Sequence, residues 1–103
     1  MLDKATVVAT ANRYAGEVVK KYNPLAVVLF GSYVNGTPHE DSDIDIAVVF
    51  NGSEGDWLST AKDLWRISSR ISYSIEPHLL DTSDDQSGFA HHVLHTGDVI
   101  YQA

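Results

Sequence analysis

The chain has 103 residues, of which 44% are hydrophobic and 20% are charged, and it contains no cysteine. These values are typical of one globular domain over residues 1–103, and they exclude disulfides, thiolate metal sites and cysteine nucleophiles. Fourteen Asp and Glu residues against seven Lys and Arg residues give a net charge of −7. This balance disfavours a nucleic-acid partner, because such binding depends on basic residues that neutralise phosphates.

The first part of the chain predicts a helix followed by a buried strand. Apolar side chains recur at helical spacing between residues 3 and 22. The unbroken apolar run 25–30, closed by Gly31, predicts a strand that is buried on both faces and lies centrally in a sheet. This run is too short to cross a membrane, and residues 1–4 lack the pattern of a signal peptide. We therefore expect a cytoplasmic protein without a membrane partner.

A segment rich in turn-forming residues, 31–42, leads to a second strand. Within it, residues 32–35 can form one helical turn. Residues 43–50 alternate in character, which predicts a strand that is polar only at its beginning. Asp43 and Asp45 are two residues apart, so their side chains are expected on the same face of this strand.

The second half predicts two more helices and two more strands. Residues 56–70 show helical spacing, and a third strand is expected over residues 71–80. Pro77 cannot donate a ladder hydrogen bond, which places this strand at an edge of the sheet or gives it a bulge. A short helix over 89–96 and a terminal strand over 99–101 follow. The order of elements predicts an α+β domain of two layers, with a small mixed sheet and helices packed on one side.

The pattern with the clearest chemical meaning is Gly31-Ser32, ten further residues, and then Asp43-Ile44-Asp45. A glycine after a buried strand lets the backbone turn sharply, so that its N–H groups and a serine hydroxyl can hold a phosphate. Two carboxylates on one strand face can converge on a pair of magnesium ions, the usual arrangement for displacement at phosphorus. Each half alone is more typical of an ordinary turn or a solvated loop end, but their combination at this spacing favours the functional interpretation.

The segment GSYVNGTPHEDSDIDIAVVF, residues 31–50, resembles the signature of the DNA polymerase β-like nucleotidyltransferases in their minimal, single-domain antitoxin branch. The resemblance implies a nucleotidyltransferase fold. It also implies that Gly31 and Ser32 hold the triphosphate of the nucleotide, and that Asp43 and Asp45 bind two Mg²⁺ ions and the nucleotide and act in catalysis.

Members of this family bring a third carboxylate from a later strand, and Glu76 is similar in position. The resemblance gives Glu76 the role of a third metal ligand or of the catalytic base, although the following Pro77 also fits an exposed glutamate on an edge strand. His78 shares the strand face of Glu76 and could touch the substrate or be an ordinary surface histidine. Family members often carry an Arg or Lys between the serine and the aspartates, whereas this chain has Asn35 and His39 there. Loss of that fixed positive charge beside the triphosphate would weaken nucleotide binding or slow the transfer.

The function that the resemblance implies is transfer of AMP from ATP to an acceptor hydroxyl, such as a tyrosine of a HEPN-type toxin, with release of pyrophosphate. The alternative is an inactive antitoxin of the same fold that neutralises a HEPN ribonuclease toxin by binding it. The small size of the domain implies that a partner protein or a second copy supplies a missing wall of the site. Trp57, Trp65 and Tyr73, where exposed, are the aromatic residues expected at that contact.

Overall fold

The computed structural model describes residues 3–35, 43–52 and 55–103, apart from the side chains of Ser32 and Asn35. None of the helices in these segments is long and apolar enough to cross a membrane. The elements follow in the order α1 (Lys4–Lys21), β1 (Ala26–Phe30), α2 (Ser32–Asn35), β2 (Ile44–Phe50), α3 (Trp57–Ile71), β3 (Ile75–Asp81), the 3-10 turn η1 (Thr82–Asp84), α4 (Phe89–Thr96) and β4 (Asp98–Gln102).

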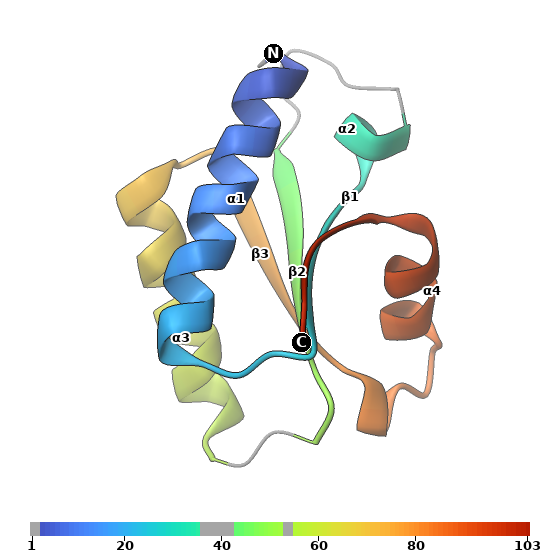
Figure 1. The fold of residues 1–103 in the computed structure, drawn as a ribbon. Coiled ribbons are helices and arrows are strands. Elements are labelled where there is room, and N and C mark those ends of the chain that lie inside the picture. Colours follow the sequence, from blue (N-terminus) through green and yellow to red (C-terminus); the bar gives the residue numbers. More distant parts are fainter. Residues whose placement is uncertain (1–2, 36–42, 53–54) are drawn as a thin grey trace.

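The four strands form one mixed sheet in the order β3-β2-β1-β4. Strand β1 is antiparallel to both of its neighbours, whereas β2 and β3 run parallel and are joined through α3. Helices α1 and α3 lie together on one face of the sheet, and α4 lies on the opposite face (Figure 1). The predicted central position of β1 and the predicted edge position of β3, with its Pro77, are both confirmed.

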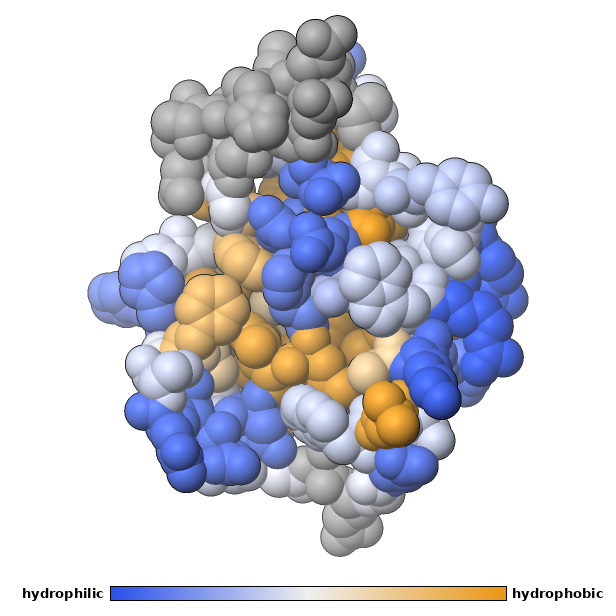
Figure 2. Space-filling model, turned by 180° about the vertical axis from the view of Figure 1, so that it is seen from behind, coloured by the Kyte–Doolittle hydropathy of each residue, from blue (hydrophilic) through white to orange (hydrophobic). Residues whose placement is uncertain are grey.

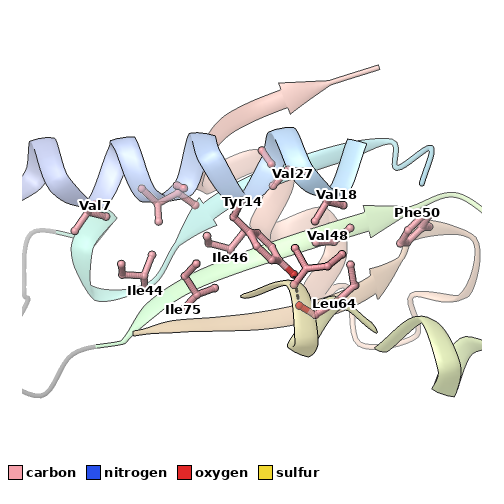
Figure 3. Close-up of a cluster of buried hydrophobic side chains, with 14 residues drawn as sticks. Val7, Tyr14, Val18, Val27, Ile44, Ile46, Val48, Phe50, Leu64 and Ile75 are labelled. Carbon is pink, nitrogen blue, oxygen red and sulfur yellow. Dashed lines mark hydrogen bonds between the residues drawn. The ribbon is translucent and has the colours of Figure 1, made fainter. Parts of the chain in front are cut away.

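The larger core lies between the sheet and the two long helices (Figure 3). The side chain of Asp3 caps the N-terminus of α1 by accepting a hydrogen bond from the Thr6 N–H, and it thereby satisfies one of the free N–H groups of the first turn. The Tyr14 ring is fully buried, and its hydroxyl donates a hydrogen bond of 3.0 Å to the Leu64 carbonyl oxygen on α3. This bond connects the two helices through the middle of the core.

The opposite face of the sheet carries a smaller apolar cluster under α4, which includes Val28, Ala47, Val49 and Val93. The mixed sheet and the packing of two helices on one side are as predicted, but α4 departs from the prediction because it covers part of the second face. Strand β1 explains this, since both of its faces are apolar and both therefore need a covering layer.

The third strand begins at Ile75, four residues after the predicted start at Ile71. Helix α3 continues through Ile71 and ends when the Ser72 N–H bonds the Ser68 carbonyl oxygen. Ile71 packs against the larger core from the end of α3, next to the buried Ile67. The predicted start of the strand at Ile71 is wrong, because an apolar residue at this position suits the last turn of a helix as well as it suits a strand.

Candidate functional site

The turn after β1 brings the backbone unusually close to β2. Gly31 has a φ of +83°, in the left-handed region that favours glycine. A Cβ atom at this position would overlap Oδ2 of Asp45 and would lie 3.1 Å from its Cγ. Gly31 therefore serves both the turn into α2 and the space that the Asp45 carboxylate occupies.

The register of the sheet places Asp45 in the middle of a row of three residues. Phe30 on β1 is its partner on one side, and Glu76 on β3 is its partner on the other. His78, two residues after Glu76, points to the same face of the sheet, and its Nε2 lies 3.1 Å from Oδ1 of Asp45. One ligand atom from each of Asp45, Glu76 and His78 lies within 4.8 Å of the others, which is close enough for these residues to share one metal ion.

Aromatic rings form the apolar side of this cluster. The Phe30 ring meets the His78 imidazole in a T-shaped arrangement with 4.9 Å between ring centroids. It also meets the ring of Phe89, on α4, at 5.9 Å. These contacts favour a particular orientation of the imidazole. The side chains of His78 and Asp45 are 31% and 23% exposed, so an ion or substrate can reach them from solvent.

The other predicted site residues lie near this cluster or outside the described structure. Asp43 is exposed and directly precedes β2, but it is not part of the 4.8 Å group that the described residues form. Ser32 begins α2, directly after Gly31, and its side chain lies outside what the structure describes. His39 lies outside the described residues altogether.

Positive charge is distributed very unevenly in this fold. All seven Lys and Arg residues of the sequence belong to α1 or α3, which cover the face away from the cluster. The segments that surround Asp45, Glu76 and His78 contain neither residue type. Phosphates held at this position would therefore depend on metal ions or on a partner for opposite charge.

A groove of about 620 Å³ opens beside the cluster, between β3 and α4. Figure 2 shows this side of the molecule, with hydrophobic surface at its centre and hydrophilic residues above and below. Backbone N–H groups of Ala90 and His91 donate hydrogen bonds to Asp85 and hold the pKa of its carboxyl below the ordinary value, so the groove keeps a negative border. Its wall consists of Trp57, Leu79, Leu80, Asp81, Asp84, Asp85, Gln86, Ser87, Phe89 and Ala90.

Sequence reasoning anticipated the shared face of Glu76 and His78 but not what His78 contacts. Alternation along one strand places two side chains on one face. The contacts of His78 with Asp45 and with Phe30 depend on the pairing of β3 with β2 and of β2 with β1, and no local pattern states which strands become neighbours. The groove was missed for the same reason, because α4 was not expected on this face.

The sequence and the fold are both similar to those of nucleotidyltransferases. The model of the family described as "Polymerase beta, Nucleotidyltransferase" matches residues 15–103. A protein from Sulfolobus solfataricus assigned to the nucleotidyltransferases is 26% identical in its solved structure, with a TM-score of 0.66 over 95% of this chain and 82% of that one.

Two further solved structures share the fold at lower identity. One chain comes from a toxin–antitoxin complex with AMP-PNP, with 23% identity and a TM-score of 0.63, and another comes from a mutant of the toxin–antitoxin MntA–HpeT, with 21% identity and a TM-score of 0.62. Each match covers 89% of this chain and 73% of the other. No curated protein matches the sequence.

Proposed function

The chain belongs to the polymerase β family of nucleotidyltransferases, and we propose that it transfers a nucleoside monophosphate, AMP from ATP, to an acceptor hydroxyl. The acceptor oxygen forms a bond to the α-phosphorus. The bond between the α-phosphorus and the oxygen that bridges it to the β-phosphate breaks, and pyrophosphate leaves. The observation that carries the proposal is the placement of Asp45 and Glu76 side by side on neighbouring strands, next to the glycine turn that begins α2.

The residues present fit divalent metal ions of the kind that such a transfer uses. Carboxylate oxygens are the ligands that Mg²⁺ prefers, and Asp45 and Glu76 supply them at one place, with Asp43 directly before the strand that carries Asp45. Bound magnesium would polarise the phosphate oxygens and offset the charge that develops on them. We assign Asp43 and Asp45 to metal binding, and Glu76 to a third ligand position or to accepting the proton of the acceptor hydroxyl.

Gly31 and Ser32 are assigned to the triphosphate. The left-handed backbone of Gly31 turns the chain directly after β1, so that the first N–H groups of α2 follow at the edge of the carboxylate cluster. Backbone N–H groups in such a turn form concave donor sites for anions. The same glycine keeps the Asp45 carboxylate close to these donors, because any side chain would occupy its place.

We propose that the acceptor is a hydroxyl of a partner protein, specifically a HEPN-type toxin, with this chain as the antitoxin. The fold similarity to chains of toxin–antitoxin complexes supports this assignment. Trp57, Trp65 and Tyr73 are 40%, 52% and 93% exposed, and large exposed aromatic side chains are typical of protein contacts. The open side of the cluster leaves room for an acceptor that a partner brings.

The direct test compares ATP binding by calorimetry, with and without Mg²⁺, for wild type, Asp45→Asn and Glu76→Gln. We expect Asp45→Asn to lose the magnesium-dependent part of binding, and Glu76→Gln to lose it as well when Glu76 is a ligand and not the base, while the circular dichroism spectrum of each variant stays the same. Glu17→Gln is the matched control, because it removes one exposed carboxylate from α1, on the other face of the sheet. Magnesium-dependent binding that survives in both Asp45→Asn and Glu76→Gln would refute the metal role.

A second candidate function, neutralisation of the toxin by binding alone, is favoured by the absence of Lys and Arg from the segments around the cluster. Without a fixed positive charge beside the triphosphate, transfer would be slow. Incubation with α-labelled ATP, magnesium and the toxin distinguishes the two functions, since transfer labels the toxin. If Asp45→Asn still neutralises the toxin without labelling it, binding alone is the function.

A further inference from the structure

The cluster of Asp45, Glu76 and His78 contains one nitrogen donor, the His78 imidazole, among its oxygen donors. Asp45 comes from β2 and is paired with Glu76 on β3. His78 follows Glu76 by two residues on the same strand. All three side chains are partly buried, and their nearest ligand atoms lie within 4.8 Å of one another. Two neighbouring strands of a regular sheet hold them, so the arrangement does not depend on a loop.

The distances suit one six-coordinate ion. Bonds of about 2.1 to 2.2 Å to a divalent ion place two neighbouring ligand atoms roughly 3.0 to 3.1 Å apart and two opposite ones roughly 4.2 to 4.4 Å apart. Nε2 of His78 lies 3.1 Å from Oδ1 of Asp45, which matches neighbouring ligands. The 4.8 Å limit for the whole group lies a few tenths of an ångström beyond opposite ligands. Small side-chain rotations therefore suffice to bring the three residues onto one ion.

The two neighbouring carboxylates of the cluster also favour the binding of a cation. Asp45 and Glu76 are directly paired across β2 and β3, and like charges at directly opposite positions destabilise a sheet. The Lys and Arg residues belong to helices on the other face. A bound divalent ion would offset this repulsion between the two carboxylates.

A nitrogen ligand changes which ion a site prefers. Mg²⁺ favours oxygen ligands, whereas the affinity of a site with a nitrogen ligand rises through the divalent transition metals, beginning with Mn²⁺. The Phe30 ring packs against the imidazole at 4.9 Å and favours an orientation with Nε2 toward Asp45. Mn²⁺ is the weakest binder of that series, so a preference for Mn²⁺ over Mg²⁺ is the most demanding test of a nitrogen ligand.

We propose that His78 is a metal ligand together with Asp45 and Glu76, and that the cluster binds a divalent transition-metal ion more tightly than Mg²⁺. This inference rests on the proposed function, which assigns Asp45 to metal binding; it commits Glu76 to the ligand role, and it adds His78 as a ligand and a preference among ions.

The test measures ion binding to the nucleotide-free full chain. Electron paramagnetic resonance follows Mn²⁺ binding, and competition with Mg²⁺ gives the ratio of the two affinities. Pulsed electron paramagnetic resonance detects the coupling between bound Mn²⁺ and the nitrogen-14 nucleus of a ligand. For His78→Ala we expect the nitrogen coupling to disappear and Mn²⁺ affinity to fall at least about tenfold, with a much smaller change for Mg²⁺. His92→Ala, at an exposed position of α4, is the matched control and should behave like wild type.

A second variant separates ligation from a hydrogen bond to Asp45. Gln at position 78 can still donate a hydrogen bond to Oδ1, but it offers no imidazole nitrogen. His78→Gln should therefore lose the nitrogen coupling and the preference for Mn²⁺, as His78→Ala does. If His78→Gln keeps the wild-type ratio of affinities, or if His78→Ala keeps the nitrogen coupling, then His78 is not a ligand. If wild type binds neither ion, or Asp45→Asn binds both unchanged, the metal role in the proposed function fails as well.

Discussion

Replacing Gly31 with alanine tests how tightly the turn after β1 and the Asp45 carboxylate depend on each other. The φ of +83° is costly for any residue with a Cβ, by about 1 to 2 kcal/mol. The added Cβ would also overlap Oδ2 of Asp45, and moving that side chain away from its rotamer costs about 0.5 to 1.5 kcal/mol. We therefore expect Gly31→Ala to lower the free energy of unfolding by about 1.5 to 3.5 kcal/mol.

Gly88→Ala provides the matched control for the backbone part of this cost. Gly88 has a φ of +76°, close to that of Gly31, but a Cβ there meets nothing within 4 Å. Its substitution should cost only the backbone part, about 1 to 2 kcal/mol, and should leave ion binding unchanged. Gly31→Ala should weaken Mn²⁺ and Mg²⁺ binding on the order of tenfold, because Asp45 is displaced.

The assays are urea unfolding, followed by circular dichroism, and ion binding on the same preparations. The decisive quantities are the differences between the two variants, since the common backbone cost cancels. If Gly31→Ala and Gly88→Ala lose equal stability and bind ions equally well, then the close approach of Gly31 to Asp45 has no energetic importance and the reasoning is wrong.

Three further predictions concern the helices and the turn before β4. A hydrogen bond from Lys21 is the main cause that lowers the pKa of the buried Asp63 below its ordinary value of 3.8. The ionised Asp63 carboxylate therefore stabilises the fold above that pH, and this stabilisation is lost as the pH falls below it. Asp63→Asn should flatten the acid limb of the stability–pH curve in urea titrations. Tyr14→Phe removes the hydrogen bond to the Leu64 carbonyl and should cost about 1 to 3 kcal/mol of unfolding free energy, whereas no change would show that water replaces it. A Cβ at Gly97 would lie 2.9 Å from two backbone carbonyl oxygens, so Gly97→Ala should lower the melting temperature although its φ is ordinary.

The features that could be predicted from sequence are those that local patterns encode. The apolar run of β1, the alternation of β2 and the glycine at position 31 are short patterns, and each predicts the local conformation from a few neighbouring residues. The glycine could even be connected with Asp45, because the spacing of the motif places both at the ends of two consecutive strands.

The features that could not be predicted depend on contacts between distant elements. His78 meets Asp45 because β3 runs parallel to β2 in one register, and a shift of that register by one residue would turn His78 to the other face. The position of α4 depends on which face of the sheet α1 and α3 leave uncovered. The amphipathic pattern of a single helix or strand predicts neither the register of β3 against β2 nor the face of the sheet that α4 covers.

The concentration of every Lys and Arg on α1 and α3 has a consequence for the order in which ligands arrive. Under the proposed function, a nucleotide without a metal ion would approach Asp45 and Glu76 as a polyanion approaching two carboxylates, and the repulsion would extend over a Debye length of about 10 Å at 0.1 M salt. The ion–nucleotide complex carries less negative charge and meets less resistance. For the proposed reaction we therefore expect an ordered association in which the ion arrives before the triphosphate or together with it, and we expect high ionic strength to weaken this ordering.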